Sequence, residues 1–200
     1  MNDVIVDVAP QSYVRQGASH CGAFAVKGVL SAFGLDHSDH ASELHIHPLS
    51  KYTGSAVSAD YYPSILRMHG LSAKAASASN LSDSQRLNLI KSEIDRGCPV
   101  IVQVANHFDR QSGAWDPFKG IIASHWFSIW GYNDDEACFY TYDSLISEKL
   151  VDGDVPVGNK RRSFSTFLQI WVGSQLSRRV FGTHSWIQVE RPESKRAPSR

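Results

Sequence analysis

The fold of this chain is decided by the stretch Gln16-Gly-Ala-Ser-His-Cys21-Gly-Ala-Phe-Ala-Val-Lys-Gly-Val-Leu-Ser-Ala-Phe33-Gly34. It predicts a loop that runs directly into a helix, because apolar residues follow one another at helical spacing: Ala23, Val26, Leu30 and Phe33. Ser19 is the expected N-cap, since its hydroxyl can accept a free amide of the first turn. Gly34 is the expected stop at the other end.

This arrangement puts Cys21 in the first helical turn. Unpaired amides and the positive end of the helix dipole lie there, and both favour the thiolate, which is the nucleophilic form of cysteine. Gln16 stands upstream in a loop that can fold its amide over the sulfur. Gly28 costs stability inside a helix, so we expect a neighbour to pack closely against it.

Composition places the chain among ordinary globular proteins. Its 200 residues are enough for one domain with a full core, and 42% are hydrophobic and 20% charged. Lys+Arg and Asp+Glu are balanced at 20 each, which gives no bias toward nucleic acid or an anionic membrane. No apolar run approaches the ~20 residues of a membrane span. Residues 191–200, with two prolines and four basic residues, are expected to be a disordered tail.

The N-terminus and the cysteines suggest where the protein acts. Acidic residues stand where a signal peptide would carry its positive charges, so we expect a chain that starts near Met1 and stays in the cytoplasm, or is exported by a signal-less route. Three widely spaced cysteines without a Cys-x-x-Cys pair argue against a disulfide framework and a zinc ribbon. We interpret Cys98 and Cys138 as buried apolar fillers.

Helical patterns come first along the chain and strand patterns second. Helices are predicted over 58–68 and over 163–172. A third helix is predicted between them, which begins at a capping box at Ser82–Gln85 and stops at Gly97 and Pro99. Strands are predicted over 4–8, 100–104, 125–132, 137–142 and 186–189, with an extended piece at 73–76. Residues 35–56 are expected to be irregular apart from a short helix at 41–45, and 106–124 to form a long loop. This order predicts an α+β fold with an antiparallel sheet.

Cysteine hydrolysis needs a thiolate, a base that protonates the leaving group, a group that orients the base and a donor for the oxyanion. His125 begins one predicted strand, and Asp143 ends the next one 18 residues later. In a hairpin these two residues return to each other and share a face. Direct pairing of 125 with 143 would centre the turn on Asp134 and would require an odd loop or a bulge.

A resemblance supports this constellation. The segments Gln16…Cys21-Gly-Ala, Gly97-Cys-Pro-Val-Ile-Val, Ser124-His125-Trp-Phe-Ser-Ile-Trp-Gly-Tyr132 and Tyr142-Asp143 resemble the papain-like cysteine peptidases, most closely the bacteriocin-processing, double-glycine leader peptidases. The likeness covers roughly 16–171. It implies a helical subdomain that is led by the nucleophile helix and packed on an antiparallel sheet, within one catalytic domain over 1–190.

Carried over residue by residue, the resemblance makes Gln16 the oxyanion donor, Cys21 the nucleophile, His125 the base and Asp143 the orienting acid. It implies a peptide or protein substrate and no cofactor. His20 departs from the pattern, because an acidic residue is expected before the nucleophile in the leader-peptidase branch.

Other polar clusters have simpler interpretations. His37, His40, His45 and His47 lack a standard ligand spacing, so we expect a solvated histidine-rich linker and no metal. The pair Arg161 and Arg162 is expected to be solvated. The tryptophans are expected in the core or in cleft walls: Trp115, Trp126, Trp130, Trp171 and Trp186.

Three functions fit these features. The first is a cysteine peptidase that acts through a thioester acyl-enzyme. The second is an acyltransferase or transpeptidase with the same site, as a resemblance to phytochelatin synthases permits. The third is an inactive binding module. A bacterial effector that acts inside a host is one way in which the first could be realised.

Overall fold

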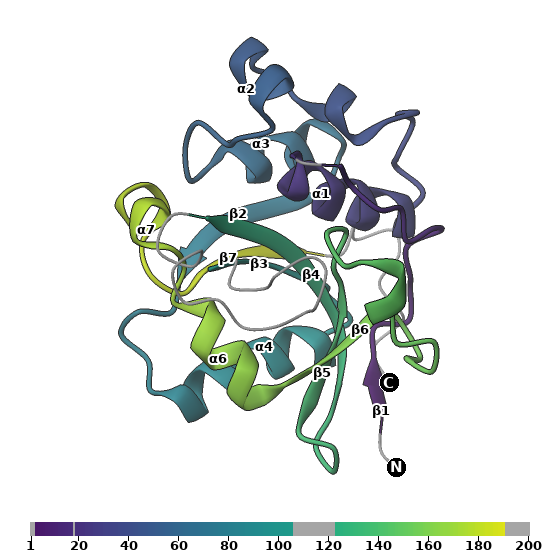
Figure 1. The fold of residues 1–200 in the computed structure, drawn as a ribbon, viewed down its shortest axis with the longest axis vertical. Coiled ribbons are helices and arrows are strands. Elements are labelled where there is room, and N and C mark those ends of the chain that lie inside the picture. Colours follow the sequence, from purple (N-terminus) through teal and green to yellow (C-terminus); the bar gives the residue numbers. More distant parts are fainter. Residues whose placement is uncertain (1–2, 18, 106–122, 191–200) are drawn as a thin grey trace.

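The computed structural model describes residues 3–17, 19–105 and 123–190, which form a twisted antiparallel sheet with helices on both sides (Figure 1). The strands are β1 (Asp3–Ile5), β2 (Ser72–Ser77), β3 (Val100–Ala105), β4 (Ser124–Asn133), β5 (Cys138–Tyr142), β6 (Lys160–Ser163) and β7 (Ser185–Glu190). Their order is β2-β7-β3-β4-β5-β6, and β1 pairs with β4. All these pairings are antiparallel, which confirms the predicted α+β class.

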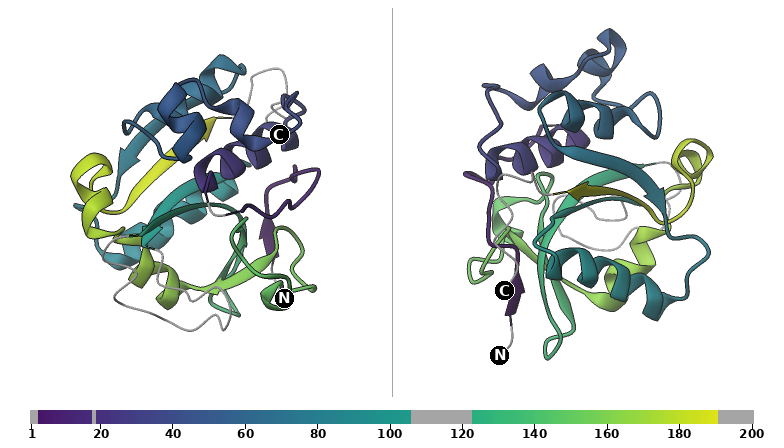
Figure 2. Two further views of the ribbon diagram at one scale, coloured as in Figure 1. Left: turned by 45° about the horizontal axis from the view of Figure 1, so that its top comes forward. Right: turned by 180° about the vertical axis from the view of Figure 1, so that it is seen from behind.

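The helices divide between the two sides of the sheet. On one side lie α1 (Cys21–Ala32), the 3₁₀ helix η1 (Ala41–Leu44), α2 (Pro48–Thr53) and α3 (Tyr61–Met68) (Figure 1). On the other side lie α4 (Asp83–Asp95) and α6 (Phe164–Trp171), and Figure 2 shows the same division from two further directions. The short helices η2 (Glu148–Leu150) and α7 (Gln175–Phe181) complete the set of described helices. Helix α1 packs on β4 and α3 on β2, so the helical layer begins with the segment that contains Cys21.

Helix α1 is more deeply buried than its predicted apolar stripe. The four predicted core positions are buried, but so are Gly22, Phe24, Ala25 and Val29. The segment that includes η1 covers the second face, where Ala23, Phe24 and Ala41 form a small cluster of their own. Gly28 is where a neighbour packs closely, as expected: a Cβ there would lie 2.9 Å from Cε1 of Tyr142.

The start of α1 corrects one prediction. Ser19 is not the N-cap; His20 occupies that position with φ of 72°, and no side chain caps the helix. This left-handed turn at His20 directs the chain sharply into the helix at Cys21. The predicted stop is confirmed, since Gly34 has φ of 70° and its N–H bonds the carbonyl of Ser31.

The histidine-rich segment is more ordered than the solvated linker that we expected, although His37, His40 and His47 are exposed. The ring of His40 accepts the N–H of Ser42 at the start of η1, and the ring of His47 accepts the N–H of Leu49 at the start of α2. His45 is buried. Short polar helices of this kind lack a long apolar period, so the sequence pattern did not reveal α2 or the extent of this layer.

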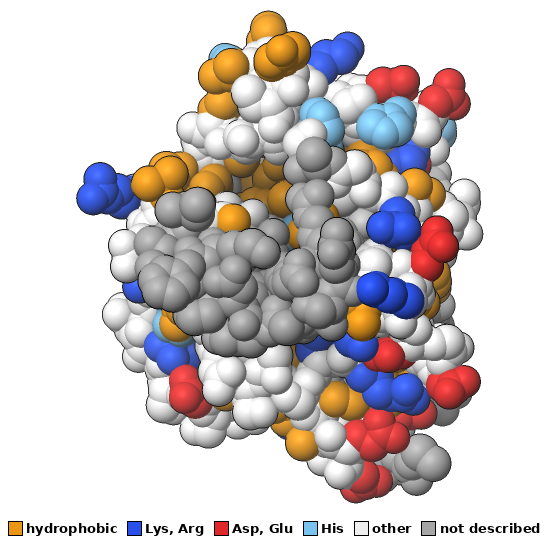
Figure 3. Space-filling model, viewed as in Figure 1, with side chains coloured by type: hydrophobic (Ala, Val, Ile, Leu, Met, Phe, Trp, Pro, Cys, Tyr) orange, Lys and Arg blue, Asp and Glu red, His pale blue; other side chains and the backbone are white. Residues whose placement is uncertain are grey.

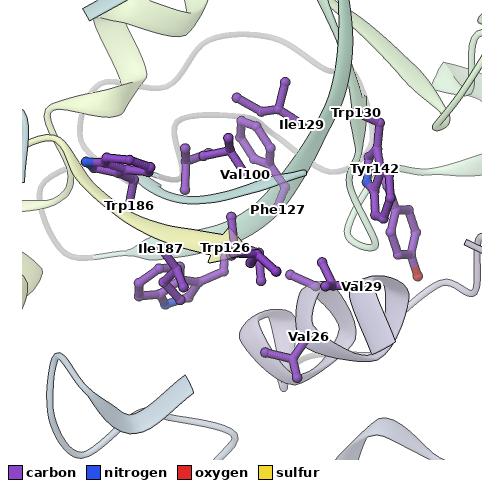
Figure 4. Packing of buried hydrophobic residues seen from close by; sticks show 14 of the residues in the cluster. Val26, Val29, Val100, Trp126, Phe127, Ile129, Trp130, Tyr142, Trp186 and Ile187 are labelled. Atoms are coloured by element: carbon purple, nitrogen blue, oxygen red, sulfur yellow. The ribbon is translucent and has the colours of Figure 1, made fainter. Parts of the chain in front are cut away.

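Strand β4 is buried along nearly its whole length because both faces of the sheet are covered. In Figure 4, Trp126 and Ile187 lie on the side of Val26 and Val29 of α1, whereas Phe127 lies on the opposite side. The predicted core roles of Trp126, Trp130, Trp171 and Trp186 are confirmed, as is the burial of Cys98 and Cys138. Trp115 and the tail 191–200 lie outside the described residues.

The β4–β5 hairpin has a different register from the one that we expected. A four-residue turn joins the strands, and a bulge at Trp130 shifts the pairing, so that Ser128 lies opposite Tyr142. Continuing this register places Asp143 opposite Phe127 and not opposite His125. The two site residues still share a face, because 125 and 127 are two positions apart.

Candidate active site

Cys21 is the first residue of α1, and its sulfur contacts three groups. The His125 side chain and the backbone of Trp126 and of Gly22 all hydrogen bond to it. Burial acts to raise the pKa of this thiol, but these hydrogen bonds and the charge of His125 outweigh burial and bring the pKa below its ordinary value of 9.0. The site therefore favours the thiolate at Cys21.

His125 lies between Cys21 and Asp143 and is buried. Its Nε2 is 2.7 Å from Oδ1 of Asp143, which leaves Nδ1 as the ring nitrogen for the thiol. Burial acts to lower the pKa of His125, but the charge and hydrogen bond of Asp143, followed by those of Cys21, raise it to about 10. The ring is thus held as an imidazolium between two anionic partners.

Asp143 is fixed by more partners than the sequence indicated. Burial acts to raise its pKa, but the charges of His125 and Arg162 hold it well below the usual range. Arg162 donates to Oδ2, and the N–H of Leu145 donates to Oδ1 at 2.9 Å. Asn159 brackets the backbone, because it accepts from the N–H of Asp143 and donates to its carbonyl, both at 2.9 Å.

The position of Arg162 corrects a prediction. We expected a solvated side chain, whereas Arg162 is buried against Asp143. Its guanidinium also lies 4.8 Å from the ring centroid of Phe127, which shares a face of β4 with His125. It belongs to β6, whose sequence Lys-Arg-Arg-Ser has no apolar alternation and was therefore missed as a strand. The adjacent Arg161, also expected to be solvated, is partly exposed and pairs with Glu136.

Gln16 is tied to the residue that follows Asp143. Its Oε1 accepts the hydroxyl of Ser144 at 2.6 Å, and its backbone N–H donates to the carbonyl of Ser144 at 2.8 Å. Because the oxygen of the carboxamide is occupied, its NH₂ group is the end left to face the pocket that Gln16 lines together with Cys21. Ser144 was not predicted, and its only signal was its place next to Asp143.

A pocket of about 220 Å³ opens beside Cys21. Its walls come from the loop before α1, from the segment between α2 and α3, and from β3, β4 and α7, and they include Gly54, Tyr62, Gln103, Trp126 and Phe181. In Figure 3 apolar side chains are visible in the hollow between the α2–α3 end of the molecule and α7. The pocket thus brings together three of the four predicted site residues, Gln16, Cys21 and His125, with Asp143 behind His125.

A second histidine belongs to the same pocket. His20 lines the pocket, and its Nδ1 is 3.0 Å from Nε2 of His45, whose Nδ1 is 3.0 Å from the hydroxyl of Tyr61. Burial lowers the pKa of His20 and lowers that of His45 to about 4. The imidazole rings of His20 and His45 are therefore neutral near pH 7.

The described residues contain no cluster of three or more His, Cys, Asp or Glu side chains that could hold a metal ion. Within the same residues no helix has the length and apolarity to cross a membrane.

Comparisons with known proteins agree with the fold. The profile of the Peptidase_C39 like family matches residues 5–174. Two solved structures are similar in fold: a double glycine motif protease from an AMS/PCAT transporter in complex with its leader peptide, and a putative C39-like peptidase from Bacillus anthracis. The first has a TM-score of 0.53 at 13% sequence identity, and the match covers 94% of this chain and 98% of the protease chain. The second has a TM-score of 0.54 at 12% sequence identity, and the match covers 96% of this chain and 100% of the other chain. No curated protein matches the chain.

Proposed function

We propose that this chain, which belongs to the Peptidase_C39 like family, is an active cysteine peptidase that cleaves a peptide or amide bond through a thioester acyl-enzyme. The observation that carries the proposal is the continuous chain of contacts from Cys21 through His125 to Asp143. A buried thiol alone is usually inert, but one that contacts an imidazolium at a helix N-terminus is activated. We assign the catalytic unit to residues 1–190.

In the first step the Cys21 thiolate attacks the carbonyl carbon of the scissile bond. The imidazolium of His125 then donates its proton to the leaving amine, the C–N bond breaks, and a thioester remains on Cys21. Asp143 holds the ring by Nε2, so that Nδ1 is the atom that gives the proton. In the second step neutral His125 takes a proton from water, the hydroxide attacks the thioester, and the acid product leaves as the thiolate is restored.

The negative charge on the carbonyl oxygen needs donors that are already in place. We assign this role to the NH₂ group of Gln16, which the hydroxyl of Ser144 orients by its hold on Oε1. The first turn of α1 adds backbone N–H groups that no carbonyl within the helix can pair. Since Ser144 follows Asp143, one turn of the chain positions both the acid and the oxyanion donor.

The substrate class follows from this chemistry. One structure of similar fold holds a leader peptide, and we propose a peptide or protein substrate for this chain as well. The pocket has room for one or two side chains, which fits an extended peptide whose scissile carbonyl lies over Cys21.

A library of acetyl-tetrapeptide coumarin amides tests the proposal. Wild-type protein should release coumarin from part of the library and Cys21→Ala from none. Brief iodoacetamide treatment at neutral pH, followed by mass spectrometry, should label Cys21 and spare the buried Cys98 and Cys138. No release by wild-type protein, together with equal labelling of all three cysteines, would leave the binding-module interpretation in place.

A further inference from the structure

Gln103 is a buried polar residue that the proposed reaction does not use. It lies on β3 and is 1% exposed. Neither its Nε2 nor its Oε1 has a hydrogen-bond partner in the described parts of the chain, although both atoms are buried. A carboxamide in such a position costs free energy unless something else satisfies it, because burial removes the water that would otherwise bond to it.

The position of Gln103 shows where a partner would come from. It lies directly opposite Trp126 across the β3–β4 ladder, so the two side chains share a face of the sheet. The backbone of Trp126 bonds the sulfur of Cys21, and Gln103, Trp126 and Cys21 line the same pocket. The unpaired amide is therefore part of the wall of the cleft and is not sealed in the core.

Aromatic side chains form the part of the wall beside Gln103. Trp126 packs edge-on against both Tyr62 and Phe181, which form neighbouring parts of the wall. Gly173 has φ of 76°, and a Cβ there would lie 3.9 Å from Oε1 of Gln103, so the chain after α6 approaches the amide from one side. An amide in a pocket wall with no partner of its own can act as a specificity determinant, because it favours ligands that can pair with it.

We propose that Gln103 is a specificity-determining residue that pairs with an amide group of the substrate through its own N–H and C=O. This inference rests on the proposed function, since it concerns a substrate of the same cleft. A carboxamide presents one donor end and one acceptor end, and a second amide matches both at once. The amide belongs either to an Asn or Gln side chain or to a peptide unit of the substrate backbone.

Gln103→Met tests the proposal, because methionine keeps the length and removes both polar atoms. Gln188→Met on the neighbouring strand β7 is the matched control; its amide bonds Glu93 and does not line the pocket. The probes are acetyl-tripeptide chloromethyl ketones that alkylate Cys21, with Asn, Gln, Leu or Met at each position in turn. A second set replaces one backbone amide at a time by an ester. Rates of alkylation are measured by mass spectrometry.

If the partner is a side-chain amide, wild-type protein should prefer Asn or Gln at one position by roughly tenfold to a hundredfold, and Gln103→Met should lose or reverse the preference. If the partner is a backbone amide, one ester replacement should slow wild-type labelling and leave Gln103→Met unaffected. Gln188→Met should behave as wild type in both sets. The same preferences in wild-type and Gln103→Met protein would overturn the proposal.

A second measurement works without the reaction. In Cys21→Ala protein, the side-chain NH₂ resonances of Gln103, assigned by their loss in Gln103→Met, should shift when an acetyl-tripeptide amide is added. Without peptide, Gln103→Met should melt at a higher temperature than wild type, since two unpaired polar atoms are gone. A shift of these resonances in Cys21→Ala protein, together with no alkylation of Cys21 in wild-type protein, would contradict the proposed peptidase activity and support the amide site. No shift, or a lower melting temperature, would defeat the amide site itself.

Discussion

Two histidines line the pocket beside Cys21, and they differ in charge. His125, from the sheet, contacts Asp143 and has a pKa raised to about 10. His20, from the loop before α1, contacts His45 and has a lowered pKa. Burial acts to lower the pKa of both rings, so the difference comes from their charged neighbours: Asp143 and Cys21 raise the pKa of His125, whereas His40 lowers that of His20 further.

The comparison shows that adjacency in sequence does not decide which histidine bonds the thiol. His20 is adjacent to Cys21 in sequence, yet its neighbours keep it neutral. His125 is 104 positions away in sequence, yet its side chain hydrogen bonds to the sulfur of Cys21 and to Asp143, which in turn pairs with Arg162. The sheet therefore carries the charged histidine, His125. The helical layer and the loop before it carry the thiol of Cys21 and the neutral ring of His20.

The largest expected effect comes from removing the charged histidine. His125→Ala should reduce turnover nearly as much as Cys21→Ala, on the order of 10⁴-fold or more, because the thiolate loses its counter-ion and the leaving group its acid. Asp143→Ala should cost less, since it orients the ring and does not react. Release of coumarin from the peptide library measures all three. Equal losses for His20→Ala and His125→Ala would remove the distinction between the two rings.

The buried ion pair behind His125 should be visible in stability. Arg162→Met removes one partner of a buried carboxylate, which typically costs about 3–5 kcal/mol of unfolding free energy. Arg161→Met is the control, because Arg161 is the partly exposed neighbour that pairs with Glu136 and should cost about 1 kcal/mol or less. Urea denaturation at pH 7 compares them. A similar loss in both variants would mean that Arg162 contributes no more than a surface charge.

Gln16→Ala should lower kcat on the order of a hundredfold with little change in KM, the effect of a donor that acts in the transition state. Ser144→Ala should give a smaller loss of the same kind, since Gln16 remains but its Oε1 is no longer held. Steady-state kinetics on one peptide from the library separates the two constants. A rise in KM at unchanged kcat would instead make Gln16 a residue that binds the ground state.

The smallest expected effect belongs to the neutral ring. His20→Gln keeps a polar side chain beside the pocket and should change turnover by no more than a few fold, with the pH dependence unaltered. The pH–rate profile is the measurement. An acid limb that disappears in His20→Gln would show that the charge of His20 controls the reaction after all.

Much of the site could be predicted because its residues stand at recognisable boundaries. Cys21 begins a helix, His125 begins a strand, and Asp143 follows one. The supporting residues could not be predicted in this way. Arg162 and Asn159 act through a strand whose sequence is charged, and their pairing with Asp143 arises only when β6 joins β5.

The fold shows the same division. The capping box of α4 and the apolar strands β3 and β4 follow from local pattern, and the Ser82–Gln85 box is confirmed. The register of the hairpin depends on a four-residue turn and on a bulge at Trp130. The turn shifts the pairing away from a centre at Asp134, and the bulge recovers only part of that shift, so direct pairing of His125 with Asp143 was wrong. In the same way, η1 and α2 depend on histidine rings as helix caps, and histidine is not among the residues preferred at that position.

The central claim is that His125 keeps Cys21 as a thiolate, and thiolate absorbance at 240 nm tests it directly. The difference between wild-type and Cys21→Ser protein, followed across pH, reports this one thiol. We expect the signal to persist below pH 9.0, the ordinary pKa of the thiol, because His125 stays protonated up to about pH 10 and lowers the pKa of Cys21. In His125→Ala the titration should move upward, since burial remains without the partner. A wild-type Cys21 that ionises only at or above its ordinary pKa of 9.0 would contradict the account.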